Sequence, residues 1–374
     1  MKIKFNPFIP IILAGIFLIS CSKKDTNYEP VQLSAETQSR LDSVFGAAMK
    51  NYEIPGAIVA IWSPKGNYIK ARGFSNLATG EPMKVENNFR IGSVTKTFTG
   101  TIVLQLVDDG KINLDSSLAF YLPQYRFPKA NKITVRMLGN MTSGIYSYTS
   151  DPDWVQSNLA NNWETIFPAD SLIKVALRHP LDFEPGTKYS YSNTTPLILG
   201  LICEKVTGKS MRELFTEKIF RPYHLSSTFW PNNRYLPAPY SHGYCKMNSG
   251  SEFKDMTLLN PSYSGVSGNL VSNIYDLAKW VKMLGKGTLY SAGMNAERMK
   301  WTTGSSNSYG FALMNLAGSL DFLILGHGGA IWGYNTFAYY IPSKDFVIIV
   351  HVNYYSRGGE YPAQALGQDI LGAL

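Results

Sequence analysis

Segments with the pattern of β-strands lie near both ends of the chain, and the stretch between them is mostly helical in pattern. Near the N-terminus, residues 56–75 hold two apolar runs on either side of Pro64-Lys65-Gly66-Asn67, which predicts a hairpin. Further strand-like runs span 309–316, 321–326, 334–341 and 345–353. Strands gathered at the two ends predict one sheet built from both of them. This is an α+β arrangement, because strands and helices do not alternate along the chain.

Helical periodicity fills most of the remaining sequence. Residues 35–52 carry apolar side chains at helical spacing, and residues 93–108 form a long, mostly apolar segment that ends before Gly110. Further helices are predicted at 134–140, 170–178, 194–207, 210–219, 274–284, 291–300 and 361–373. We therefore expect an antiparallel sheet from both chain ends, flanked by helices, with a mostly helical lobe inserted between its two halves.

The first 20 residues have the pattern of a bacterial export signal. Lys2 and Lys4 precede an apolar run at 11–19 that is too short to span a bilayer. The run leads into Leu-Ile-Ser-Cys, which resembles a lipobox, where an aliphatic and a small residue precede a cysteine that is lipidated. The alternative is an ordinary cleaved signal in which Cys21 is incidental.

These features divide the chain into a lipoprotein signal peptide at 1–20, a lipidated tether at 21–34 and a folded domain at 35–374. We expect an exported lipoprotein of the bacterial cell envelope, anchored to a membrane through a lipid on Cys21 rather than spanning it.

Composition and charge exclude other classes of protein. Charged residues make up 17% of the chain, against an average of about 25%, which excludes a disordered, solvating chain. The formal net charge of +8 loses two units when the leader with its two lysines is removed. The remaining basic residues do not cluster, so we expect no nucleic-acid partner. We expect a monomer.

The cysteines and histidines show no metal-ligand spacing, so we predict no metal. Cys203 lies in an apolar helical run and Cys245 in an aromatic-flanked segment. The two can pair in an oxidising compartment, but the apolar surroundings favour a buried free Cys203. The histidines other than the one discussed below are His179, His224, His242 and His351.

Ser93 and Lys96 form an S-x-x-K motif at the start of the helix predicted over 93–108. Side chains three residues apart share one face of a helix, so the hydroxyl and the amine can meet. A serine needs a neighbouring base to become a nucleophile, and a lysine is a base only when its pKa is lowered. The alternative is an N-capping serine and a solvated lysine. The nearly uncharged sequence after Lys96 argues against it.

Two further motifs carry polar groups suited to the same chemistry. In Tyr191-Ser192-Asn193, the tyrosine can relay a proton near a Ser–Lys pair, and the amide can orient the lysine and hold a substrate carbonyl. Gly326-His327-Gly328-Gly329 follows a predicted strand, and its glycines let a backbone edge approach a ligand. Each motif has a structural alternative: an Asn N-cap after an aromatic packing segment, and a histidine held by packing.

The motifs S-x-x-K, Y-x-N and H-x-G, taken in this order, resemble those of the serine β-lactamase-like superfamily. The most similar branch comprises the secreted D-alanyl-D-alanine carboxypeptidases, class C β-lactamases and related esterases. The resemblance covers about residues 35–373 and includes ITVRMLGNMTSGIYSY and PGTKYSYSNTTPLILG. It implies the β-lactamase/DD-peptidase-like fold and makes residues 35–374 a catalytic domain.

The resemblance also implies an acyl-enzyme mechanism without a metal or organic cofactor. Ser93 would attack a carbonyl, and Lys96 and Tyr191 would transfer protons. The backbone N–H groups of Ser93 and of the residue after H-x-G would hold the oxyanion. The groups expected to bind substrate and oxyanion are Asn193, His327, Gly329 and Ala330.

The chain departs from the carboxypeptidase pattern where a substrate carboxylate would dock. Those enzymes commonly follow the histidine with Thr-Gly-Thr and place an arginine on the preceding strand. Here the triplet is Gly328-Gly329-Ala330, and the strand offers Met314. Each missing charge-assisted hydrogen bond is worth roughly 1.5–3 kcal/mol, so an esterase or a peptidase for uncharged substrates gains weight. An aromatic wall from Trp154, Tyr263 and Trp332, or simple core packing of these residues, is expected.

We therefore predict a serine hydrolase of the cell envelope, most similar to a D-alanyl-D-alanine carboxypeptidase, with an esterase or a β-lactamase as alternatives. Its substrate would be a peptide, an ester or a β-lactam. A non-catalytic penicillin- or peptidoglycan-binding lipoprotein is the alternative from another class of function. That alternative is disfavoured because Ser93, Lys96 and Tyr191 are all present.

Overall fold

The computed structural model describes residues 31–155, 164–246, 251–302, 308–317, 322–356 and 361–374. The folded unit is Val31–Leu374. The predicted signal peptide and Cys21 lie outside the described residues. Among the described residues, no helix is both long and apolar enough to cross a bilayer.

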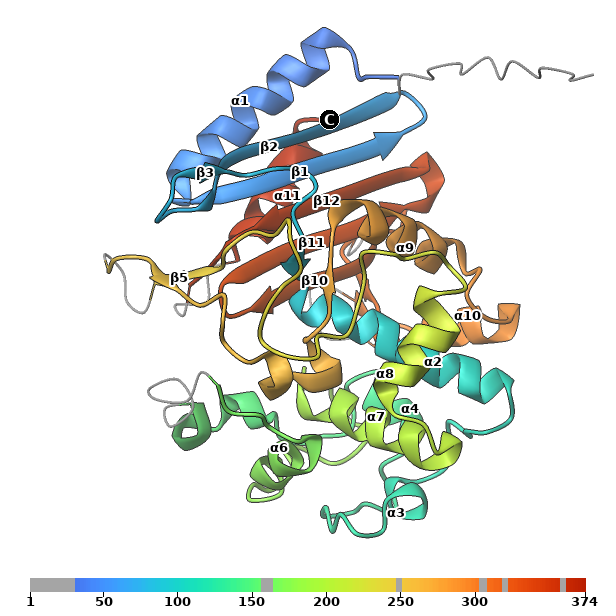
Figure 1. Ribbon diagram of the computed structural model, residues 1–374. Coiled ribbons are helices and arrows are strands. Elements are labelled where there is room, and N and C mark those ends of the chain that lie inside the picture. The colour runs from blue at the N-terminus through green and yellow to red at the C-terminus, as the bar shows by residue number, and fades with distance from the viewer. Residues whose placement is uncertain (1–30, 156–163, 247–250, 303–307, 318–321, 357–360) are drawn as a thin grey trace, which may run out of the picture. The chain divides into compact units, whose positions relative to one another are not determined.

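Both ends of the chain contribute to one antiparallel sheet, in the order β3-β2-β1-β12-β11-β10-β9-β8 (Figure 1). N-terminal β1 pairs with C-terminal β12, from Ala57 opposite Val352 to Trp62 opposite Val347. This confirms the predicted α+β fold. The strands are β1 (Gly56–Ser63), β2 (Gly66–Asn76), β3 (Glu81–Pro82), β8 (Ser308–Tyr309), β9 (Met314–Asn315), β10 (Leu325–Ile331), β11 (Tyr334–Ile341) and β12 (Phe346–Val352).

Helices cover both faces of the sheet. Successive residues of its central strands are therefore buried on opposite sides. Ile58 and Val59 of β1 are both fully buried, and they belong to different cores. Helices α1 (Ala35–Asn51) and α11 (Pro362–Gly372) pack over one face, where Phe45 is part of the core. Helix α9 (Ile274–Lys286) packs on the other face through Trp280.

The inserted lobe surrounds helix α2 (Thr95–Asp108), which follows a 3-10 turn, η1 (Gly92–Val94). All residues from Thr95 to Leu104 are buried, so this helix is enclosed on every side instead of being amphipathic. It runs between the sheet and the lobe (Figure 1). The other helices are α3 (Leu118–Tyr121), α4 (Val135–Gly139), α6 (Ala169–Ala176), α7 (Thr194–Thr207), α8 (Met211–Phe215) and α10 (Ala292–Arg298).

Some predicted boundaries are wrong. The strand predicted over 309–316 is two short strands, β8 and β9, because the chain turns at Ala312, which has a φ of +50°. The strand predicted to end at residue 326 starts at Leu325 and continues to Ile331, so His327 lies within β10. The helix predicted over 210–219 is α8 followed by a π-helical turn, Thr216–Phe220. Two small sheets were not predicted, β13 (Tyr354–Ser356) with β5 (Tyr244–Lys246) and β6 (Lys254–Asp255), and β4 (Phe89–Arg90) with β7 (Val271–Ser272).

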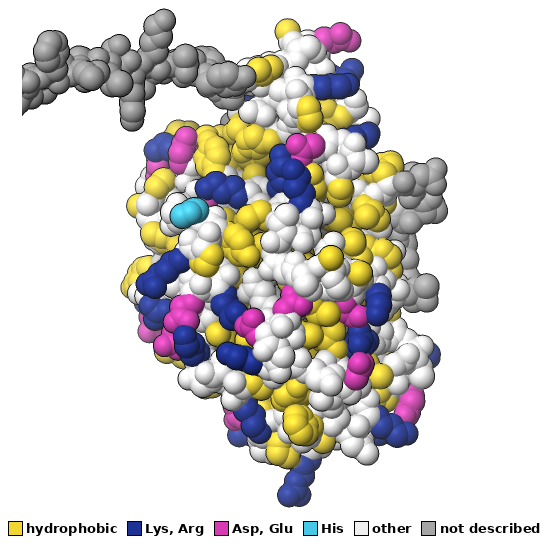
Figure 2. All heavy atoms as spheres, turned by 90° about the vertical axis from the view of Figure 1, so that its right-hand side faces the viewer, with side chains coloured by type: hydrophobic (Ala, Val, Ile, Leu, Met, Phe, Trp, Pro, Cys, Tyr) yellow, Lys and Arg dark blue, Asp and Glu magenta, His cyan; other side chains and the backbone are white. Residues whose placement is uncertain are grey.

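Cys203 and Cys245 are both free and buried, so the disulfide considered from the sequence is not formed. At the surface, basic and acidic side chains are interspersed over the face shown in Figure 2. Ion pairs such as Lys129 with Glu184 and Lys218 with Asp109 join residues from different elements of the lobe. The positive charge is therefore not gathered into one patch on this face.

Candidate active site

Ser93 lies where the start of α2 meets the edge of the sheet. The preceding Gly92 has a φ of +52°, and a Cβ there would lie 2.7 Å from the backbone nitrogen of Ala330 in β10. A Cβ at Gly329 would lie 2.0 Å from the carbonyl oxygen of Ile91. Only glycine fits both positions, because real Cβ atoms do not approach backbone so closely. The two glycines bring β10 against the turn that carries Ser93.

Lys96 lies behind Ser93 and is completely buried. Its Nζ is 2.9 Å from Ser93 Oγ, 2.7 Å from Asn193 Oδ1 and 2.8 Å from the carbonyl oxygen of Ser267. Among the described residues no carboxylate pairs with it, and burial lowers the pKa of the amine well below its usual value. A neutral amine has two N–H donors and one lone pair. As placed, Nζ donates in all three contacts; once neutral, it would still donate to the two carbonyl-type oxygens and could accept the Ser93 proton.

Tyr191 approaches Ser93 from the segment before α7. Lys96 Nζ lies 4.9 Å from the centre of its ring. Burial raises the pKa of the phenol, while its hydrogen bond with Ser93 lowers it; the net direction is upward. The phenol is therefore protonated at neutral pH, so of the two states considered for a proton relay the structure favours the hydroxyl over the phenolate.

Asn193 is held from both ends of its amide. Its Oδ1 accepts from Lys96, and its Nδ2 donates to Thr149 Oγ1 at 2.9 Å. Thr149 in turn lies 2.9 Å from Ser147 Oγ. These contacts orient the amide with its oxygen toward the lysine. Thr149 and the Ser267 carbonyl are the parts of this network that the sequence analysis did not identify. Thr149 directly follows the sequence stretch ITVRMLGNMTSGIYSY, and a backbone carbonyl has no sequence signal.

His327 is buried, and its Nε2 lies 3.3 Å from the hydroxyl of Tyr309. Burial lowers the pKa of the imidazole to about 3. The ring is thus neutral at physiological pH and acts as a hydrogen-bonding group, not as a cation. Tyr309, which was not predicted, comes from β8 and contacts both His327 and Tyr191.

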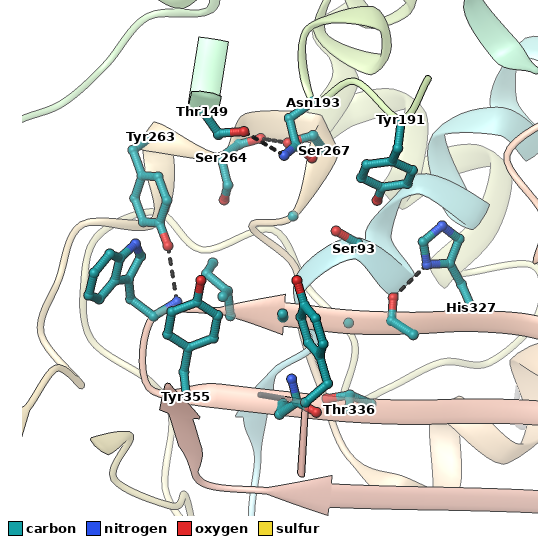
Figure 3. A pocket seen from close by; sticks show the side chains of 18 of the residues that line it. Ser93, Thr149, Tyr191, Asn193, Tyr263, Ser264, Ser267, His327, Thr336 and Tyr355 are labelled. Atoms are coloured by element: carbon teal, nitrogen blue, oxygen red, sulfur yellow. Dashed lines mark hydrogen bonds between the residues drawn. The ribbon is translucent and has the colours of Figure 1, made fainter. Parts of the chain in front are cut away.

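A cavity of about 730 Å³ opens onto Ser93 (Figure 3). Ser93, Tyr191 and His327 point into it, and the predicted aromatic residues Trp154, Tyr263 and Trp332 line it. The remaining predicted site residues that line it are Asn193, Gly329 and Ala330. Among the described residues that line it, none is Asp, Glu, Lys or Arg. No group of three or more His, Cys, Asp or Glu suited to a metal occurs among the described residues either.

The family model named Beta-lactamase matches residues 41–370. The chain belongs to this family. The antiparallel sheet and the inserted helical lobe described above agree with this membership. Among curated proteins, the protein named flp of Staphylococcus aureus is 23% identical over 86% of the chain. The D-aminopeptidase of Cereibacter sphaeroides is 26% identical over 89%. The chain spans only 64% and 62% of the lengths of these relatives.

Solved structures of the family superpose on nearly the whole folded unit. A D-stereospecific amidohydrolase from Streptomyces sp. is 28% identical, with a TM-score of 0.78 over 90% of this chain and 98% of that one. The D-amino acid amidase of Ochrobactrum anthropi, in a complex with D-phenylalanine, has a TM-score of 0.80 at 20% identity, over 91% and 99%. The latter similarity shows the fold alone.

Within this family fold, the place expected for a carboxylate-binding arginine is apolar. Met314 lines the cavity, and its sulfur accepts a 3.7 Å contact from the hydroxyl of Tyr339.

Proposed function

We propose that this family member hydrolyses amide bonds of D-amino-acid compounds that are uncharged around the scissile bond, through an acyl-enzyme on Ser93. The observation that carries the proposal is the completely buried Lys96, whose pKa is lowered by burial and whose Nζ lies 2.9 Å from Ser93 Oγ, where a neutral amine can take the serine proton. The names of the D-aminopeptidase and the D-stereospecific amidohydrolase support the choice of amides and of the D configuration.

In the first half of the reaction, the proton of Ser93 passes to Lys96 as Oγ bonds to the substrate carbonyl carbon. The backbone N–H groups of Ser93 and Ala330 hold the oxyanion. When the C–N bond breaks, Tyr191 gives its proton to the leaving nitrogen and regains one from the Lys96 ammonium. The acyl-enzyme then contains a neutral lysine and a protonated tyrosine, as before substrate bound.

In the second half, water attacks the acyl carbonyl and gives a proton to the same Tyr191–Lys96 pair. The new tetrahedral intermediate collapses, the C–O bond to Ser93 breaks, and Oγ takes back the proton from Lys96. The product is a carboxylic acid, and every proton borrowed in the cycle has been returned. No group outside the chain is required except water.

The charge pattern of the cavity distinguishes this proposal from D-alanyl-D-alanine carboxypeptidase activity. A free carboxylate entering the cavity would lose its hydration without gaining a cation along the described walls. A free substrate ammonium would likewise find no carboxylate there. We therefore infer a preference for N-acylated substrates whose leaving group has no charge.

The experiment is a substrate panel on the wild type and on Ser93→Ala. It comprises N-acetyl-D-phenylalanine amide, its L enantiomer, a p-nitrophenyl ester, a chromogenic cephalosporin and a D-Ala-D-Ala peptide with a free C-terminus. We expect the D-amide to be hydrolysed faster than its L enantiomer and faster than the free-acid peptide, and no turnover by Ser93→Ala. Turnover of the free-acid peptide alone would instead indicate a carboxypeptidase. Turnover of the cephalosporin alone would indicate a β-lactamase.

Intact mass spectrometry with fluorescent penicillin and the activated ester tests the covalent step. A mass increase on the wild type but not on Ser93→Ala is expected, with thermal unfolding showing that the variant is folded. A lasting penicillin adduct without turnover of any substrate would favour the non-catalytic binding lipoprotein. No adduct with either reagent would rule out the acyl-enzyme.

We further propose that the protein is an exported lipoprotein of a bacterial envelope, on the strength of the lipobox-like Leu18–Cys21 after an apolar leader. Expression of the full chain in a bacterium should yield a membrane-bound form with a diacylglycerol mass on Cys21. Cys21→Ser should be released into the soluble envelope fraction. An unlipidated protein that begins after another cleavage site would instead indicate an ordinary secretory signal.

A further inference from the structure

Among the described residues, the edge of β10 beside the active site has no pairing strand. Strand β9 pairs with β10 only at Leu325 and Gly326, so no described strand covers that edge from His327 onward. Gly329 faces the turn before Ser93, whereas a Cβ at the neighbouring Gly328 would point toward α11. The cavity therefore borders β10 on both sides, and its lining includes residues of α11 as well as those of the catalytic cluster.

The end of the Gln364 side chain, from α11, lies beside Gly328. A Cβ at Gly328 would lie 3.4 Å from Gln364 Oε1 and 3.8 Å from the hydroxyl of Tyr339. Tyr339 already contacts Met314, whereas the half-buried carboxamide of Gln364 has no hydrogen-bond partner among the described residues. A polar group that lines a cavity without a protein partner is available to a ligand.

Resting on the proposed function, we propose that Gln364, reaching over Gly328, forms a subsite that binds an uncharged amide group on the leaving side of the substrate. Gly328 and Ala330 are two residues apart on one strand, about 7 Å. A substrate carbonyl held at the Ala330 N–H can thus place the next group of its leaving side near Gly328, within reach of the glutamine side chain.

The chemistry of a carboxamide favours this ligand over a carboxylate. Gln364 offers one acceptor and two donors, which pair with the N–H and the C=O of another amide. It has no charge to offset the desolvation of a carboxylate. The resemblance to carboxypeptidases implies that they bind the substrate carboxylate in this region with hydroxyls and a guanidinium. With Gln364 there instead, we expect the preferred C-terminal group to be an amide and not an acid.

The test uses two peptides that differ only in this group: N-acetyl-D-alanyl-D-alaninamide and the same peptide ending in a free acid. The measured products are D-alaninamide and D-alanine, which separates cleavage of the inner bond from loss of the terminal ammonia. Each peptide is also measured as a competitor of ester hydrolysis, so that a binding preference is obtained even where turnover is slow. We expect the wild type to prefer the amide.

Gln364→Ala should reduce that preference about tenfold, the effect of losing one or two neutral hydrogen bonds. Gln364→Lys should reverse it, because it supplies a cation for the acid. The preference is a ratio measured on one sample, so a smaller active fraction does not change it. Gln124→Ala is the matched control, since Gln124 is exposed and does not line the cavity; its ratio should stay within about twofold of the wild type.

An unchanged ratio in Gln364→Ala and Gln364→Lys, or an equally large change in Gln124→Ala, would overturn the subsite. A wild-type preference for the acid would do so as well. Failure of the proposed function has a different signature: neither peptide nor the ester reacts, and no mass is added to Ser93. In that case the subsite proposal is lost together with the function on which it rests.

Discussion

At the scale of single residues, the decisive feature is a lysine with no carboxylate partner among the described residues. The contacts of Lys96 are all with neutral oxygens, and burial disfavours its charged form. The same burial keeps the Tyr191 phenol protonated. A neutral base, Lys96, and a protonated acid, Tyr191, thus lie side by side, as the first step requires. Both protonation states result from burial in the folded protein.

The first prediction concerns the pH dependence of acylation. Because only the neutral amine accepts the proton of Ser93, kcat/KM for an activated ester should rise with pH and level off well below 10.5, the ordinary lysine value. In Lys96→Ala, kcat/KM should fall at least about a hundredfold and should no longer rise with pH in this range. A stopped-flow profile from pH 5 to 11 is the measurement. A rate that keeps rising beyond pH 10 would contradict a lowered lysine pKa.

At the scale of elements, β10 and the turn before α2 position the site. The contact is made by backbone against backbone, since the glycines at 92 and 329 leave no side chain between the two elements. The sequence analysis identified H-x-G as an edge that approaches a ligand. It placed this motif after the strand, because the pattern of apolar residues ends where the glycines begin, whereas the backbone pairing with β11 continues to Ile331.

The second prediction compares neighbouring glycines of β10. Gly329→Ala should destabilise the protein by about 1–3 kcal/mol and displace the oxyanion-binding N–H, because its Cβ would overlap the Ile91 carbonyl. Gly328→Ala should change the free energy of unfolding by less than about 0.5 kcal/mol, because its Cβ would meet only the end of the Gln364 side chain. Urea unfolding measures both. Equal losses of stability would show that the close approach at residue 329 is not what requires glycine.

At the scale of the whole molecule, one sheet joins the two ends of the chain, and buried histidines lie within it. His351 of β12 stacks on Phe89, with ring centres 3.7 Å apart, and its Nε2 lies 3.0 Å from Ser241 Oγ. Burial lowers the pKa of this imidazole to about 3. This histidine thus links a C-terminal strand to the segment that leads into Ser93.

The third prediction is a loss of stability in acid. Between about pH 6.5 and pH 3 the unfolded chain binds a proton at His351 that the folded protein excludes, so the free energy of unfolding falls as the pH falls. The slope is up to about 1.4 kcal/mol per pH unit for each such histidine. For His351→Gln, the free energy of unfolding in urea should fall less steeply between pH 7 and pH 4.5 than it does for the wild type. Identical slopes would mean that the imidazole is already charged in the folded protein.

The sequence by itself determined what is local or periodic. The strand patterns at both ends predicted the sheet, and the three-residue spacing predicted that Ser93 and Lys96 share a helix face, because backbone geometry alone decides both. Only the tertiary structure decided the rest: the Ser267 carbonyl on Lys96, the tyrosine on His327, the neutral histidine and Gln364 over Gly328. These features depend on burial and on contacts between residues far apart in the chain, and neither leaves a pattern along the sequence.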